Sequence, residues 1–267
     1  MAKSGTDSTN RVARLALDLM SWPMALIVFA TPLGIAVASA AESFSPEQIA
    51  VFGKCEKSPP ATQIQDCSAA IDSKLFQKPQ LVGLYVNRAN AYDANGDKDS
   101  ALKDYNRALE LAPDSAGIYY NRGVLFMSRK DTDSALRDYD TAIRLSPGYV
   151  AALYNRGRIF AFKNDFAHAL ADYSEAIRLS PAALVYRERG SIYLQTNQLQ
   201  RSLDDENEAI KLDPAMAYAY YLRGIAYGKL GDNQKSSSDT LKAVQLDPKL
   251  SQLIKLNGQS LVPTPSQ

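Results

Sequence analysis

Five prolines recur along the chain at intervals of 33 or 34 residues: Pro113, Pro147, Pro181, Pro214 and Pro248. Ahead of each proline, a small residue, an aromatic residue and two further small residues follow one another at fixed places. Such a period is typical of repeat architectures, in which each repeat buries its apolar surface only against its neighbours. The repeat therefore constrains the fold more strongly than the composition does.

The five repeats cover residues 82–115, 116–149, 150–182, 183–216 and 217–248. With each repeat numbered from one, place eight is Gly or Ala, place eleven Tyr or Phe, place twenty Ala or Ser, and place 27 Ala. Apolar residues at helical spacing, such as Ala101, Tyr105 and Ala108, predict a helix in each half. Turn residues separate the halves and the proline ends the second, so each repeat is predicted to be two antiparallel helices of about 13 residues.

This pattern resembles the tetratricopeptide repeat (TPR) family over about residues 82–250. The resemblance implies an all-α fold, a right-handed α-solenoid of five helix-turn-helix repeats with a concave face. Residues 41–81 are expected to form a degenerate helical hairpin that caps the array, and residues 249–267 a short capping helix with a loose tail.

The first 40 residues differ from the rest. Arg11 and Arg14 precede an uncharged stretch from Leu19 to Ala41 that ends in small residues. This order is typical of a secretory signal peptide, here residues 1–40 with cleavage after Ala40, and it predicts an exported, periplasmic protein. The alternative is an uncleaved membrane anchor, because the uncharged stretch of 23 residues is long enough to span a membrane.

The chain contains two cysteines, Cys55 and Cys67, both in the predicted hairpin. Export and the even count favour a disulfide that joins the two helices, with two buried free thiols as the alternative. A metal site needs more ligands than these cysteines and the distant His168 supply, so neither a metal nor a cofactor is expected. Lys and Arg number 30 against 29 Asp and Glu, so no basic excess points to nucleic acid.

Every repeat has Arg at place seven, where Leu is usual in the family, and Asp at place 23. The residues are Arg88, Arg122, Arg156, Arg189 and Arg223 with Asp104, Asp138, Asp172, Asp205 and Asp239. The structural interpretation is that each Arg stem covers apolar surface near the helix seam while its guanidinium meets an Asp, within one repeat or between neighbours. The alternative is an arginine ladder that faces a ligand.

Place six is Asn in the first three repeats: Asn87, Asn121 and Asn155. The family resemblance implies that this place faces the concave groove, where an amide can both donate to and accept from a peptide backbone. Some members of the family bind a carboxylate with such an Asn flanked by Lys or Arg, and those basic residues are missing here. The series more closely resembles the asparagine ladder by which other members bind an extended peptide, with Tyr120 and Tyr154 at place five as anchors. Alternatively, the asparagines bridge helices and the tyrosines pack the next repeat.

No catalytic motif or nucleotide-binding loop is found, so an enzyme is not expected. The preferred hypothesis is a non-catalytic adaptor or scaffold outside the cytoplasm that binds an extended peptide or a protein surface. The alternative is a structural or self-associating part of an envelope assembly, which docks through an apolar end around Tyr218, Tyr221 and Leu222. Membrane contact is expected only if residues 1–40 remain as an anchor.

Overall fold

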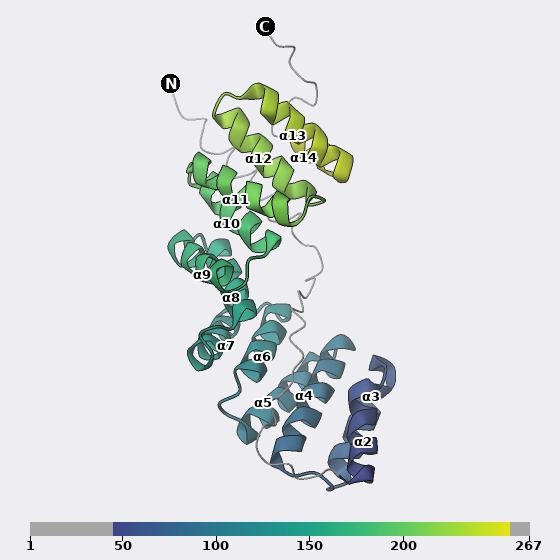
Figure 1. Cartoon of the computed structure of the whole chain (residues 1–267). Coiled ribbons are helices and arrows are strands. Elements are labelled where there is room, and N and C mark those ends of the chain that lie inside the picture. The colour runs from purple at the N-terminus through teal and green to yellow at the C-terminus, as the bar shows by residue number, and fades with distance from the viewer. Residues whose placement is uncertain (1–44, 257–267) are drawn as a thin grey trace. The chain divides into compact units, whose positions relative to one another are not determined.

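The computed structural model describes residues 45–256, which contain thirteen helices and no strand (Figure 1). They form two compact bodies, the N-terminal body at 45–180 and the C-terminal body at 181–256. The predicted signal peptide at 1–40 and the loose tail from residue 257 lie outside the described residues. No helix among residues 45–256 is long and apolar enough to cross a membrane.

The helices follow one another as hairpins. The N-terminal body contains α2 (Pro46–Lys57), α3 (Pro60–Asp72), α4 (Lys78–Ala94), α5 (Lys98–Leu111), α6 (Ala116–Ser128), α7 (Thr132–Leu145), α8 (Val150–Phe162) and α9 (Phe166–Leu179). The C-terminal body contains α10 (Ala183–Gln195), α11 (Leu199–Leu212), α12 (Ala217–Lys229), α13 (Asn233–Leu246) and α14 (Leu250–Leu256). In each predicted repeat the first helix packs on the second, and within each body the second also packs on the next repeat.

The turn inside each repeat has a consistent backbone geometry. Place fifteen has a positive φ in all five repeats, in the left-handed region that Gly and Asn enter readily. The residues are Gly96, Lys130, Asn164, Asn197 and Gly231. Place sixteen is Asp in four repeats, and its carboxylate accepts a hydrogen bond from the backbone N–H three residues later. This N-cap starts the second helix at a defined residue.

The small residue at place eight lets the two helices of a repeat approach closely. A Cβ added to Gly123 on α6 would lie 2.7 Å from Cε1 of Tyr139 on α7, and one added to Gly157 would lie 2.8 Å from Cε1 of Tyr173. Real Cβ atoms do not come so near, so the tyrosine ring of place 24 occupies the space that glycine leaves. Tyr139 and Tyr173 are accordingly 1% and 0% exposed.

The hairpin α2–α3 precedes the repeats and packs on α4. Ser45 and Gln48 form a capping box at the start of α2, and Pro46 occupies the first turn. Cys55 and Cys67 are joined by a disulfide, with Cα atoms 4.6 Å apart, at the centre of a small core. One boundary differs from expectation: α4 begins at Lys78, inside the predicted cap at 41–81, because Pro79 is accepted in the first turn of a helix.

We expect replacement of both cysteines by alanine to lower the free energy of unfolding of the α2–α3 hairpin by about 2–4 kcal/mol. The hairpin has few other buried apolar residues, and the disulfide limits the conformations of its unfolded state. Hydrogen exchange of the α2 and α3 amides checks this, with reduced wild-type protein as the control that should behave alike. Unchanged protection in both samples would contradict the prediction.

Candidate functional site

The five Arg–Asp sets form within single repeats. In each repeat the arginine Nε and Nη2 donate to the two carboxylate oxygens of the aspartate sixteen residues later, over 2.7 to 2.9 Å. The aspartate side chains are between 6% and 9% exposed. Such two-fold, charge-assisted contacts satisfy a buried carboxylate.

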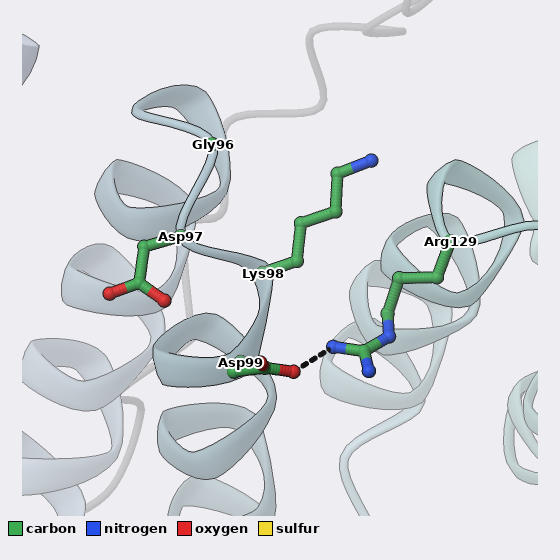
Figure 2. A pocket seen from close by; sticks show the side chains of 5 residues that line it. All are labelled: Gly96, Asp97, Lys98, Asp99 and Arg129. Atoms are coloured by element: carbon green, nitrogen blue, oxygen red, sulfur yellow. Dashed lines mark hydrogen bonds and ion pairs between the residues drawn. The ribbon is translucent and has the colours of Figure 1, made fainter.

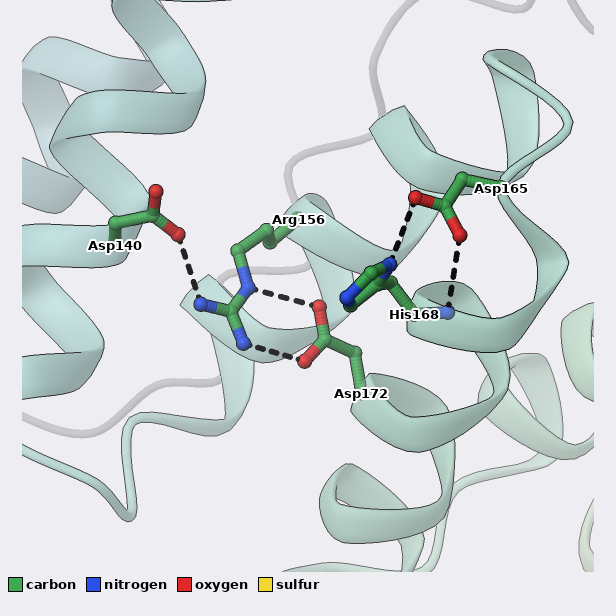
Figure 3. A network of polar contacts seen from close by, with 5 residues as sticks. All are labelled: Asp140, Arg156, Asp165, His168 and Asp172. Carbon is green, nitrogen blue, oxygen red and sulfur yellow. Dashed lines mark hydrogen bonds and ion pairs between the residues drawn. The ribbon is translucent and has the colours of Figure 1, made fainter.

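The remaining terminal nitrogen of the arginine reaches the preceding hairpin. Nη1 of Arg156 donates to Asp140 over 2.8 Å, while the other two nitrogens bind Asp172 (Figure 3). Arg122 donates in the same way to Asn106, and Arg223 to Asn207. Each of these arginines therefore contacts both its own and the preceding repeat, whereas the sequence left open whether the contact lies within one repeat or between neighbours.

Aromatic rings at places four and eleven flank the same arginines. The guanidinium carbon of Arg122 lies 5.4 Å from the ring centroid of Tyr119 and 5.8 Å from that of Phe126. Arg88 and Arg189 likewise lie near rings at both places, whereas Arg223 lies near Tyr220 and Arg156 near Phe160. With its nitrogens bonded and at least one face against a ring, the place-seven arginine has little left to offer a ligand, which supports the structural interpretation over the ladder.

A surface hollow lies where the α4–α5 turn meets the end of α6, and Figure 2 shows the side chains that line it. Arg129 pairs with Asp99 over 2.6 Å, and Lys98 Nζ donates to the Ser128 carbonyl over 2.6 Å. A second exposed pair, Lys163 with Asp133, joins the next two repeats at the same 30-residue separation. These contacts join hairpins, and exposed pairs of this kind contribute little stability.

The three asparagines at place six have different surroundings. The amide of Asn155 donates to the Tyr120 hydroxyl over 3.3 Å, which links α8 to α6. Asn87 and Asn121 are half-buried, and their side chains make no hydrogen bond within residues 45–256. The first helices of the first two repeats, α4 and α6, therefore each carry one side-chain amide that is available to a ligand.

A tyrosine cluster formed by Tyr120, Tyr139 and Tyr149 lies next to Asn155, whose amide contacts Tyr120. The Tyr120 ring centroid is 5.1 Å from that of Tyr149 and 5.9 Å from that of Tyr139. Burial raises the pKa of all three hydroxyls, that of Tyr149 to about 12, so they stay protonated hydrogen-bonding groups. The cluster thus combines apolar aromatic rings with uncharged hydroxyl groups that can form hydrogen bonds.

Tyr154, the other predicted anchor, is only 8% exposed. Its ring lies 6.0 Å from that of Tyr173, and the guanidinium carbon of Arg158 lies 5.7 Å from its centroid. The Tyr154 ring therefore packs inside the third repeat and offers little surface to a ligand. Arg158, which the sequence interpretation did not consider, is the exposed residue beside it.

In the C-terminal body, Glu206 stands at place 24, where the first three repeats have Tyr105, Tyr139 and Tyr173. Glu206 is fully buried, and neither carboxylate oxygen has a hydrogen-bond partner within the described residues. A Cβ added to Gly190 would lie 2.5 Å from its Oε1, so the carboxyl group lies against the α10 backbone. Burial raises the pKa of Glu206 well above its usual range.

The apolar end that the self-association hypothesis invoked is placed differently. Tyr221 and Leu222 are 2% and 4% exposed, and Tyr218 packs partly buried against them. Leu253 and Ile254 of α14 belong to the same core cluster. The expectation that these residues form a docking surface was wrong, because they build the interior of the C-terminal body.

The only histidine of the chain lies on α9 at the surface. Nδ1 of His168 lies 2.7 Å from the Asp165 carboxylate that caps this helix (Figure 3). The centroid of its ring lies 5.0 Å from that of Phe160. Across residues 45–256, no group of three or more His, Cys, Asp or Glu side chains is arranged to hold a metal ion.

Successive helical hairpins with a small residue, a facing aromatic and a closing proline define a helical repeat protein. Residues 86–150 and 126–183 match a family model described as tetratricopeptide repeat, 190–231 one described as TPR repeat, and 217–250 a further tetratricopeptide repeat model. The chain belongs to the tetratricopeptide repeat family. No curated protein matches it in sequence.

Solved structures share the fold. YrrB, described as a TPR protein with an unusual peptide-binding site, has a TM-score of 0.61 at 21% identity over 72% of this chain and 97% of its own. MamA from Desulfovibrio magneticus RS-1 has a TM-score of 0.58 at 19% identity, over 63% and 96%. The C-terminal part of a TPR protein from Cytophaga hutchinsonii has a TM-score of 0.63 at 17% identity, over 79% and 84%.

Proposed function

We propose that the protein is a non-catalytic adaptor that acts outside the cytoplasm and binds an extended peptide, or an extended segment of a partner protein, along α4, α6 and α8. Its family and fold are those of protein-interaction scaffolds. The peptide-binding site in the description of YrrB, which shares the fold, supports a peptide as the ligand. The proposed location is supported by the Cys55–Cys67 disulfide, because disulfides persist in oxidising compartments.

One observation carries the proposal: Asn87 and Asn121 are half-buried and their amides make no hydrogen bond within residues 45–256, while Tyr120 of the tyrosine cluster directly precedes Asn121 on α6. A side-chain amide can donate to a peptide C=O and accept from its N–H, so it binds a backbone of any sequence. Tyrosine rings add contact area at low entropic cost. Asn155 is already bonded to Tyr120 and is expected to orient that ring.

Selection of peptides from a random library on the full chain, followed by binding measurements with synthetic copies, tests this proposal. We expect N87A/N121A to weaken binding by about tenfold or more, the loss expected for hydrogen bonds to the backbone. The control N233A removes an exposed amide at the start of α13 and should change nothing. Equal binding by N87A/N121A and wild type would contradict the amide ladder, and failure to select any peptide would contradict peptide binding altogether.

A further inference from the structure

Arg158 on α8 differs from the other arginines of the first helices. Six of these seven arginines have a carboxylate partner at 2.7 to 2.8 Å. Arg158 is exposed and makes no ion pair within residues 45–256, and its guanidinium stacks over the Tyr154 ring. An arginine held on a ring in this way keeps its donors directed outward and loses little freedom when it binds.

Arg158 has no acidic residue on its own helix or on the first helix of the preceding repeat. Neither α6 (Ala116–Ser128) nor α8 (Val150–Phe162) contains Asp or Glu. The other two arginines of these helices, Arg122 and Arg156, are neutralised by Asp138 and Asp172. The surface of α6 and α8 therefore carries one uncompensated positive charge, at Arg158.

Arg158 also lies close to Asn155, the residue assigned to orient Tyr120. It follows Asn155 by three residues and Tyr154 by four, so the three share one face of α8. The Asn155 amide donates to the hydroxyl of Tyr120, a member of the tyrosine cluster, over 3.3 Å. The guanidinium therefore lies on the same helix face as the amide that contacts the cluster.

We infer that the bound peptide carries an aspartate or glutamate side chain that pairs with Arg158. The inference rests on the proposed function. It adds a preference for one kind of side chain to a site whose amides contact only the backbone of the peptide. A side-chain carboxylate suits the site because the amides of Asn87 and Asn121 hold the main chain, which leaves side chains to reach α8. A guanidinium binds a carboxylate through two parallel hydrogen bonds.

The test uses the full chain and a random dodecapeptide library fused through its C-terminus, so that no displayed peptide has a free C-terminal carboxylate. Peptides selected on wild type should share an Asp or Glu at one position. R158Q should bind synthetic copies about tenfold more weakly, as expected for a lost charge-assisted hydrogen bond. R158E should shift the selection to Lys or Arg at that position. The control is R144Q, which removes an exposed arginine in the last turn of α7.

The outcomes separate this inference from the proposed function. Selected peptides without an acidic position, or an acidic preference that survives R158E, would overturn the inference while peptide binding stands. An acidic preference seen only with free C-terminal peptides would overturn it too, because the carboxylate would then come from the chain end. If no peptide binds at all, the proposed function fails and the inference fails with it.

Discussion

Replacing Arg156 with methionine is expected to lower the free energy of unfolding of the N-terminal body by about 3–5 kcal/mol. Arg156 binds both oxygens of Asp172, over 2.9 and 2.7 Å, and the aspartate side chain is only 6% exposed. Methionine preserves much of the apolar stem but leaves that carboxylate buried without a partner. The variant also loses the contact with Asp140, and with it a link between the second and third repeats.

Urea denaturation measures the loss, and hydrogen exchange of α8 and α9 locates it, because repeat arrays can open one part at a time. The matched control is R158M, two residues along the same helix, which has no carboxylate partner and should cost less than about 1 kcal/mol. The double variant R156M/D172L should recover much of the stability, since an apolar pair can replace a buried ion pair. Equal losses for R156M and R158M would contradict the assigned role.

The C-terminal body is expected to lose stability as the pH rises, and E206Q is expected to remove that loss. Burial raises the pKa of Glu206 in the folded protein above the unfolded value of about 4.3. The folded state therefore holds the proton to higher pH than the unfolded chain does. The stability that the folded protein gains from holding Glu206 protonated is fully present below about pH 4.3. It is lost as the pH rises through the raised pKa of the folded state.

Charged groups around Glu206 act in both directions. The charges of Arg187 and Arg223 lower its pKa, and those of Asp205 and Glu188 raise it, but burial is the largest effect. A neutral glutamine of nearly the same shape carries no charge to desolvate. Above the folded pKa, E206Q should therefore be more stable than wild type by about 1.4 kcal/mol for each pH unit that separates the folded pKa from the unfolded one.

The difference in unfolding free energy between wild type and E206Q, followed from pH 4 to pH 9, isolates this one carboxyl from the others that titrate. The control E208Q changes a glutamate on the same helix whose side chain is 44% exposed and pairs with Lys211, and it should stay within about 0.5 kcal/mol of wild type at every pH. A wild type minus E206Q difference that is constant with pH would show that Glu206 does not hold a raised pKa.

Local patterns made much of the fold predictable. The five prolines, the small residues at places eight and twenty and the Asp at place sixteen act through steric fit and capping within a few residues of their own position. One further signal was present but not used. Place 25 is polar in the four repeats that another repeat follows, as Asn106, Asp140, Ser174 and Asn207, and apolar in the last, as Leu241. That pattern indicates a partner for the arginine of the next repeat.

The candidate site was less predictable, because residues at the same place in different repeats have different neighbours in the structure. Asn121 and Asn155 share place six, yet only Asn155 meets a tyrosine hydroxyl. Tyr120 and Tyr154 share place five, yet Tyr154 is covered by Arg158 and Tyr173. The buried, unpartnered state of Glu206 likewise depends on what surrounds place 24 and not on its place in the period.

The sequence by itself determined the helical repeat, its turns and the placement of Arg and Asp in every repeat, because each follows from spacing and local sterics. Only the tertiary structure decided that the Arg–Asp contact closes within a repeat while the third nitrogen reaches the one before. It also decided that Arg158 stands without a carboxylate partner among the described residues. The physical reason is that partners and burial depend on the approach of helices distant in sequence, which a repeat period does not encode.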